Sequence, residues 1–120
     1  MRYVKTESSS PVDWVFLLEA MGGDGDILSE MAQLFLEFSP DQVRAVEDAI
    51  KLGDPDLLRS AAHRIKGSLA QFHVKVAWQL AAELEEHGQQ GEVTLAQELW
   101  PTLREEVDRV RQAIEVWLEG

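Results

Sequence analysis

His63 is the residue whose surroundings in the sequence most clearly suggest chemistry. On a helix that turns by about 100° per residue, it lies nearly opposite an apolar stripe and points to solvent. The stripe consists of Leu58, Ala61, Ile65, Leu69 and Phe72. The residues around the histidine are either basic or small, namely Arg59, Ser60, Lys66, Gly67 and Ala70. An exposed imidazole with clear space and fixed cations beside it suits a nucleophile that carries a phosphoryl group.

Two further features of this stretch support that interpretation. A glycine inside a helix costs about 1 kcal/mol relative to alanine, yet Gly67 lies one turn past His63 on the same face. We expect it to keep the space above the imidazole clear. The chain is strongly acidic, with a formal net charge of −11, but residues 57–82 contain no Asp or Glu. Their charged side chains are Arg59, Arg64, Lys66 and Lys75.

The run His-Arg-Ile-Lys-Gly-Ser at residues 63–68 resembles the signature of histidine phosphotransfer (HPt) domains, the relay modules of multistep two-component signalling. The resemblance extends from about Asp13 to Leu118. It includes Met-Gly-Gly-Asp at residues 21–24 and Leu-Ala-Ala-Glu-Leu-Glu-Glu at residues 80–86. One departure is His73, which stands where the family usually has a glycine, ten residues after its histidine. This departure affects the expected geometry of the bend after the His63 helix, but not the identification of His63 as the acceptor.

The resemblance implies a phosphoryl carrier rather than an enzyme. His63 would accept a phosphoryl group from the aspartate of a receiver domain and pass it to another response-regulator receiver. Its neutral Nε2 would attack in line, while the receiver supplies an acidic pocket and Mg²⁺. We therefore expect no cofactor in this chain. The sequence contains no glycine-rich phosphate loop that would bind ATP.

The resemblance also suggests roles for residues near the histidine. In the family, a carboxylate or amide on the next helix often holds the imidazole Nδ1–H, and Glu85 occupies that place in this sequence. Lys66, three residues after His63 on the same side, is expected to screen the phosphoryl oxygens. Two roles are open for Arg59, namely screening of the phosphoryl oxygens or contact with an acidic partner protein. We expect the partner-binding surface to include Arg59, Ser60, Arg64 and Ala70.

Composition narrows the possible partners. The acidic charge disfavours nucleic acid, whose backbone would be repelled. The sequence has no apolar run long enough for a membrane span and no signal-peptide core, so we expect a cytoplasmic protein. We expect it to be monomeric. The three histidines share neither a face nor a ligand spacing, so no metal site is expected. His73 and His87 are interpreted as structural. Core or interhelix packing is expected of Trp14, Trp78, Trp100 and Trp117.

Two other classes of function remain open. One is an adaptor bundle that binds a receiver without accepting phosphate. The other is the phosphoacceptor domain of a chemotaxis-type histidine kinase, phosphorylated by an attached ATP-binding domain. The partners expected for the main interpretation are response-regulator receivers and a sensor histidine kinase. The 120 residues form either a free-standing module or a piece of a hybrid sensor kinase.

The elements that must position His63 are helices, since no alternating stretch indicates a strand. Residues 1–10 are expected to be a disordered segment or linker, and residues 11–120 a helical domain. Ser10 and Pro11 are predicted to cap and open a short first helix that ends at residues 22–23. A second helix, from about residue 24 to Leu52, is predicted to bend at Pro40. Its expected apolar stripe shifts by one residue at residues 39–40, and comprises Ile27, Met31, Leu34, Phe38, Val43, Val46 and Ile50.

The His63 helix is predicted to run from about residue 54 to Phe72, and the next helix to end at residues 87–88. The inward residues of that helix are expected to be Val74, Ala77, Ala81 and Leu84. A last helix follows residue 92, bent near Pro101. Its stripe is Leu95, Leu99, Leu103, Val107, Val110, Ile114 and Trp117. Because short loops between long helices imply antiparallel neighbours, the predicted fold is all-α, an antiparallel four-helix bundle with the short N-terminal helix packed across one end.

Overall fold

The computed structural model describes residues 10–120, and within them it contains five helices and no strand. In chain order the helices are α1 (Trp14–Ala20), α2 (Gly25–Leu52), α3 (Pro55–Ala70), α4 (Lys75–Gln90) and α5 (Val93–Glu119). The predicted all-α class is confirmed. The predicted disordered segment, residues 1–10, lies outside the described residues except for Ser10.

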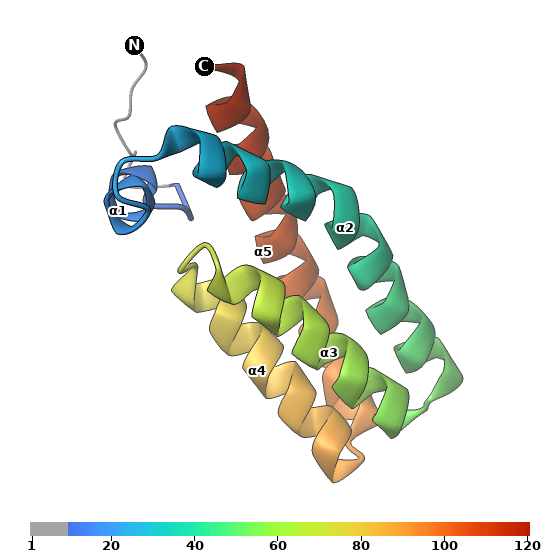
Figure 1. Cartoon of the computed structure of the whole chain (residues 1–120). Helices are drawn as coiled ribbons and strands as arrows, with labels where there is room; N and C mark the ends of the chain where they lie inside the picture. The colour runs from blue at the N-terminus through green and yellow to red at the C-terminus, as the bar shows by residue number, and fades with distance from the viewer. Residues whose placement is uncertain (1–9) are drawn as a thin grey trace.

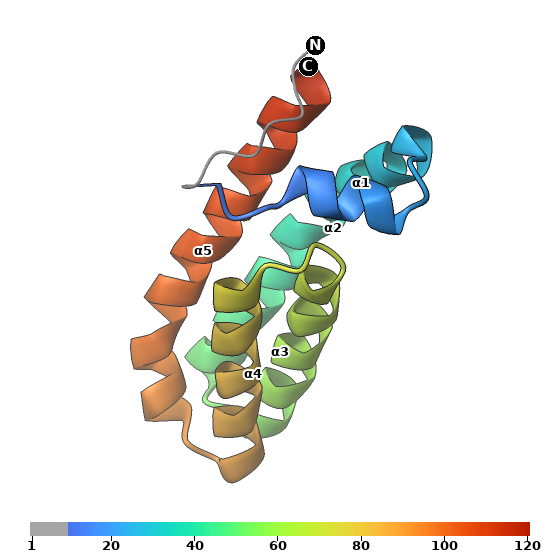
Figure 2. The ribbon, with the colours of Figure 1, turned by 90° about the vertical axis from the view of Figure 1, so that its left-hand side faces the viewer.

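The four long helices form an antiparallel bundle. Each contacts two others, in the order α2, α3, α4, α5 and back to α2, and consecutive helices run in opposite directions (Figure 1). The short helix α1 lies across the end of the bundle where α2 begins and α5 ends (Figure 2). The ring of Trp14 in α1 stacks on Trp117 of α5, with 4.5 Å between centroids. The predicted architecture is confirmed. None of the helices within residues 10–120 is long and apolar enough to cross a membrane.

Aspartates cap the first three helices. The side chains of Asp13, Asp24 and Asp54 accept hydrogen bonds from backbone amides in the first turns of α1, α2 and α3. These amides have no partner within the helix, so the carboxylates stabilise the helix ends. The start predicted for the first helix is wrong, because Asp13 rather than Ser10 is its cap, and Pro11 lies before the helix.

The C-terminal ends of two helices also differ from the prediction. The His63 helix, α3, ends at Ala70 rather than at residue 72. Helix α4 continues past residues 87–88 to Gln90 and ends where Gly91 adopts a φ of 76°. A positive φ suits glycine because it has no Cβ, so the glycine that ends this helix is Gly91, and Gly88 has another role.

Gly88 lies at a close contact between α4 and α3. It is buried, and a Cβ at this position would lie 2.7 Å from the backbone nitrogen of Arg59 and 2.9 Å from its Cα. Such contacts are too short to be accommodated without a shift of the backbone. The absence of a side chain at Gly88 therefore permits the packing of the two helices that carry the site.

The first half of α2 faces the core with a different stripe from the predicted one. Ile27, Leu34 and Phe38 are exposed, and the core instead receives Leu28, Ala32, Phe35 and Ser39. These four positions continue in helical spacing to Val43 and Val46, so the one-residue shift predicted at residues 39–40 does not occur. Two apolar stripes lie side by side on this helix, and spacing alone does not distinguish the buried one. In α5, Leu95 is likewise exposed rather than buried.

Pro40 lies inside α2, and a side chain of α5 replaces the helical hydrogen bond that the proline removes. Proline has no N–H, so the carbonyl of Leu36, four residues earlier, loses its usual helical partner. Arg111 of α5 donates a hydrogen bond to this carbonyl at 3.0 Å and another to the hydroxyl of the buried Ser39. The long-range contact thus satisfies the backbone group that the proline leaves unpaired.

Candidate functional site

His63 lies in the middle of α3 with its side chain 69% exposed. The opposite face of the helix is buried in the core, through Leu58, Ala61, Ile65 and Leu69. The predicted apolar stripe, which includes the buried Phe72 just after the helix, is confirmed. The packing of that stripe turns the imidazole outward, where another protein can reach it.

Glu85 of α4 contacts the imidazole. One of its carboxylate oxygens lies 2.9 Å from Nδ1 of His63. With Nδ1 protonated, the ring donates this hydrogen bond, and the lone pair of the neutral imidazole is then on Nε2. This contact fixes both the tautomer and the orientation of the ring. It involves only Nδ1, so Nε2 is left available.

Lys66 approaches the same carboxylate from α3. Its Nζ lies 2.6 Å from the second oxygen of Glu85, and its side chain is only 25% exposed. The two oxygens of Glu85 therefore bind two different residues of the neighbouring helix. In this geometry the ammonium of Lys66 neutralises the carboxylate that holds the imidazole.

The pKa of Glu85 reflects these contacts. Burial of its side chain, which is 19% exposed, acts to raise the pKa. The nearby ammonium of Lys66 and the hydrogen bond from His63 act in the other direction and outweigh burial, so the pKa lies below its ordinary value of 4.5. The carboxylate is consequently ionised near neutral pH, as its role as an acceptor requires.

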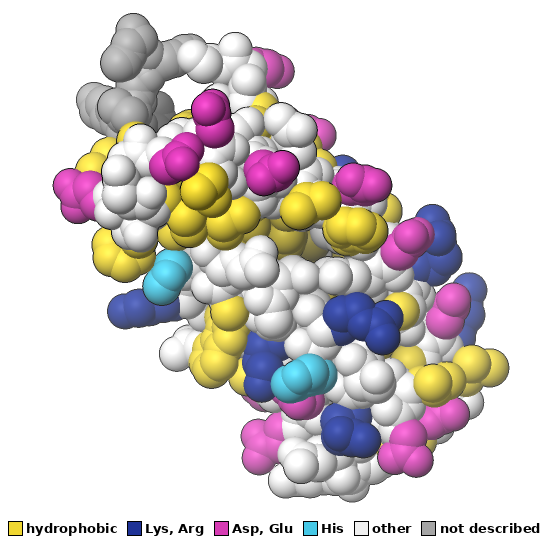
Figure 3. Space-filling model, viewed as in Figure 1, with side chains coloured by type: hydrophobic (Ala, Val, Ile, Leu, Met, Phe, Trp, Pro, Cys, Tyr) yellow, Lys and Arg dark blue, Asp and Glu magenta, His cyan; other side chains and the backbone are white. Residues whose placement is uncertain are grey.

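The surface around His63 is basic and open. Gly67 is exposed, and a Cβ added to it would meet no atom within 4 Å. The predicted partner-binding residues are all exposed on the same helix, namely Arg59, Ser60, Arg64 and Ala70. Figure 3 shows Lys and Arg side chains gathered beside a histidine over α3, although the chain as a whole has a formal net charge of −11.

The two other histidines lie elsewhere. His73 is in the turn between α3 and α4 with a φ of 53°, and its ring contacts the edge of Phe16 with 4.9 Å between centroids. A positive φ is adopted most easily by glycine, which explains why the family usually has a glycine at this position. His87, in the last turn of α4, lies 3.3 Å from the carboxylate of Glu92. Within residues 10–120, no group of three or more His, Cys, Asp or Glu is arranged to hold a metal ion.

Two features near the site were not predicted from the sequence. Trp78 of α4 was expected to pack between helices, but it is 39% exposed and lies beside Lys66, with 5.7 Å from Nζ to the ring centroid.

Exposed apolar side chains also cluster on α1 and the first half of α2. We call this cluster the α1/α2 apolar surface, and it comprises Phe16, Ile27, Leu34 and Phe38. Figure 3 shows hydrophobic side chains over α1 and α2 on the same face as the basic group.

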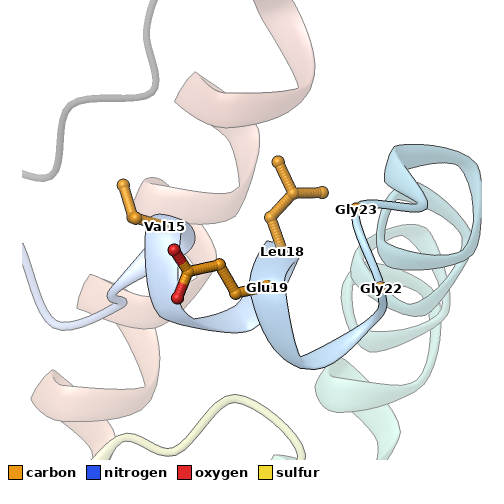
Figure 4. Close-up of a pocket in the computed structure, with 5 residues that line it drawn as sticks. All are labelled: Val15, Leu18, Glu19, Gly22 and Gly23. Carbon is orange, nitrogen blue, oxygen red and sulfur yellow. The ribbon is translucent and has the colours of Figure 1, made fainter.

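A pocket of about 440 Å³ beside α1 does not belong to this site. It is lined by Val15, Leu18, Glu19, Gly22 and Gly23. Figure 4 shows its side chains on the side of α1 away from the turn between α3 and α4. Glu19 is its one charged side chain, so the pocket lacks the set of polar groups that fixes the orientation of a ligand.

Comparisons with known proteins agree with this geometry. A family model described as an Hpt domain matches residues 30–113, which include α3 and α4. The chain is similar to the crystal structure of histidine-containing phosphotransfer protein B (HptB) from Pseudomonas aeruginosa PAO1. The identity is 24%, the TM-score is 0.83, and the match covers 93% of this chain and 97% of that chain, which shows a common fold. A comparison with curated proteins found no significant match. Since the family model spans most of the chain, the protein belongs to the Hpt domain family and is a histidine phosphotransfer module of phosphorelays.

Proposed function

We propose that His63 is the phosphoacceptor, and that this domain receives its phosphoryl group from one receiver-domain aspartate and passes it to another. The observation that carries the proposal is the contact between His63 and Glu85. Because Glu85 lies 2.9 Å from Nδ1, the free lone pair of the imidazole is on Nε2. The side chain is 69% exposed, so that nitrogen is open to a partner.

The chemistry balances without any further reactant. The Nε2 lone pair attacks the phosphorus of an aspartyl phosphate in line, the P–O bond to the aspartate breaks, and the aspartate leaves as a carboxylate. The reverse reaction on a second receiver returns Nε2 to its neutral form. The Mg²⁺ that neutralises the phosphoryl oxygens is expected in the receiver. This chain contributes orientation of the nucleophile and a surface for docking.

Docking on the face around His63 is supported by two kinds of surface. Arg59 and Arg64 complement an acidic phosphorylation pocket, and the small exposed residues Ser60 and Ala70 of the same helix leave room for a partner to approach. The α1/α2 apolar surface provides exposed hydrophobic area on the same side, of the kind that marks protein interaction sites. Gly67 leaves open space next to the imidazole. Lys66 retains its proposed role toward the phosphoryl oxygens, although in the free protein its ammonium binds Glu85.

Incubation with a phosphorylated receiver, followed by mass spectrometry of the intact chain, tests the proposal. We expect one phosphoryl group, stable to alkali and labile to acid. The His63→Gln variant should not be labelled, and the matched variants His73→Gln and His87→Gln should be labelled normally. Labelling of the His63→Gln variant at the wild-type level would refute the assignment.

The same labelling assay, extended to receiver binding and to an ATP-binding kinase domain as the phosphate donor, distinguishes the two other classes of function. Receiver binding without any phosphoryl transfer would indicate an adaptor bundle. Labelling by an ATP-binding kinase domain but by no receiver would indicate a chemotaxis-type phosphoacceptor domain. Transfer from the labelled chain to a second receiver would support the relay. Whether the module acts alone or within a hybrid sensor kinase follows from the full-length gene product.

A further inference from the structure

Trp78 is a large aromatic residue on the exposed part of α4. It lies two helical turns before Glu85, and 39% of its surface is exposed. It is not part of the core that the other residues of this helix enter, through Ala77, Ala81 and Leu84. The face of the indole instead lies near the ammonium of Lys66, with 5.7 Å between Nζ and the ring centroid.

A chain of contacts links this ring to the imidazole. The ammonium of Lys66 lies between the Trp78 ring and one oxygen of Glu85, which is 2.6 Å away. The other oxygen of Glu85 lies 2.9 Å from Nδ1 of His63. Because both oxygens are engaged, the position of the ammonium restricts the rotation of the carboxylate, and the carboxylate in turn restricts the ring.

Lysine is poorly suited to this task on its own. Its ammonium is strongly hydrated and sits on a flexible four-carbon stem, so it readily turns toward water. An aromatic face attracts a cation through its negative quadrupole and excludes water from one side. The indole of Trp78 is placed where it would supply both effects, and only 25% of the Lys66 side chain remains exposed.

We propose that Trp78 is a positioning residue for phosphotransfer, holding the ammonium of Lys66 against Glu85 so that Glu85 keeps His63 in its Nδ1–H form. This inference rests on the proposed role of His63. Trp78 does not touch the reacting nitrogen, and it acts through the two residues between them.

Three variants of α4 test the proposal. Trp78→Phe keeps an aromatic face, and Trp78→Leu keeps an apolar side chain without one. Val76→Ala is the matched control, since Val76 is an exposed apolar residue on another face of the same helix. Thermal unfolding verifies that each variant is folded before the comparison.

The first measurement uses the unphosphorylated protein and needs no receiver. Nitrogen-15 NMR of the imidazole reports the populations of the two neutral tautomers of His63. We expect Trp78→Leu to increase the Nε2–H population, and Trp78→Phe and Val76→Ala to remain close to wild type. An unchanged tautomer population in Trp78→Leu would overturn the proposal, whatever the result of the phosphotransfer assay.

The second measurement is phosphotransfer from a receiver, separated into receiver affinity and maximal rate. An exposed cation–π contact predicts that Trp78→Leu lowers the maximal rate about two- to fivefold with little change in affinity, and that Trp78→Phe restores most of the rate. A loss of affinity alone would show that Trp78 is instead a receiver contact and would overturn the proposal. If wild-type His63 accepts no phosphate, the proposed function fails, while the tautomer measurement still decides the role of Trp78.

Discussion

The imidazole of His63 has one nitrogen held by the protein and one left free, and a single carboxylate creates the difference. Glu85 engages Nδ1 with one oxygen and the ammonium of Lys66 with the other. The contact with Nδ1 orients the ring, and in the Nδ1–H tautomer the lone pair that can attack is on Nε2.

The contacts of Glu85 predict a dependence of stability on pH. Since the pKa of Glu85 is lower in the folded chain than its ordinary value of 4.5, its ionised form stabilises the fold above that value. This stabilisation is lost as pH falls through the lowered pKa of the folded state. We expect Glu85→Gln to lower the free energy of unfolding by up to about 1 kcal/mol near neutral pH, a typical value for a partly exposed ion pair.

Urea unfolding of both proteins, at neutral pH and at about pH 3, measures this effect. The difference between wild type and Glu85→Gln should shrink or vanish in acid, because protonation removes the charge from wild type as well. The comparison between the two proteins cancels the titration of the many other carboxylates. A difference that persists unchanged in acid would show that packing, rather than the ionised carboxylate, provides the stabilisation.

At the scale of elements, the site depends on the packing of α3 against α4. Neither helix contains the whole arrangement, since His63 and Lys66 come from one and Glu85 and Trp78 from the other. Two glycines within these helices have opposite functions. Gly88 is buried at the contact between them, whereas Gly67 faces open space.

Replacing each glycine by alanine should therefore change stability in opposite directions. Gly67→Ala should raise the free energy of unfolding by up to about 1 kcal/mol, because alanine is the better helix former and nothing obstructs its Cβ. Gly88→Ala should lower it by about 1–3 kcal/mol, because the Cβ would press on the backbone of Arg59. Chemical denaturation of the pair measures both changes. Equal stabilisation by both substitutions would refute the close approach of the two helices.

The link between α2 and α5 gives a second prediction at this scale. Arg111→Met removes the donor for the Leu36 carbonyl, which Pro40 leaves without a helical partner. We expect a loss of up to about 1–3 kcal/mol, the cost of leaving a buried acceptor unsatisfied, with the lower end favoured because this carbonyl is only partly buried. In a Pro40→Ala background the restored backbone amide supplies the donor, so the same substitution should cost less. An equal loss in both backgrounds would show that Arg111 acts through its other contacts.

At the scale of the whole molecule, a basic site stands on an acidic protein. The net charge is −11, yet the surface around His63 is basic (Figure 3). A phosphoryl group adds about −1.5 to −2 charges, so the local cations lower the repulsion that the chain as a whole would exert. The same cations favour approach of an acidic receiver pocket in this orientation rather than another.

Arg59→Ala tests this view of the surface. We expect receiver affinity to fall by up to about fivefold, since an exposed ion pair is worth about 1 kcal/mol or less, and the loss to shrink as salt is raised. The matched control is Arg44→Ala, which removes the same charge from α2, where Arg44 pairs with Asp41. Titration of the receiver at two salt concentrations measures both variants. Equal losses in the two would mean that net charge, and not the surface near His63, governs binding.

The sequence by itself determined the features that depend on local interactions. Aspartate caps, glycine ends and helical spacing predict five helices, and the stripe from Leu58 to Phe72 predicts that His63 points outward. The resemblance to HPt domains identified Glu85 as the partner of the imidazole, and the 2.9 Å contact agrees with it. The predictions of the helices and of the outward His63 succeeded because each rests on residues within a few turns of one another. The Glu85 contact joins two helices, and only the family resemblance indicated it.

Tertiary structure decided what depends on the choice between competing faces. The first half of α2 carries two adjacent apolar stripes, and only packing against the bundle selected Leu28 and Phe35 over Ile27 and Leu34. Trp78 could not be placed beside Lys66 from spacing, since that contact requires the register of α3 on α4. Helical period specifies which residues share a face. Which face is buried, and what it meets, depends on the volumes and hydrogen bonds of residues far apart in the chain.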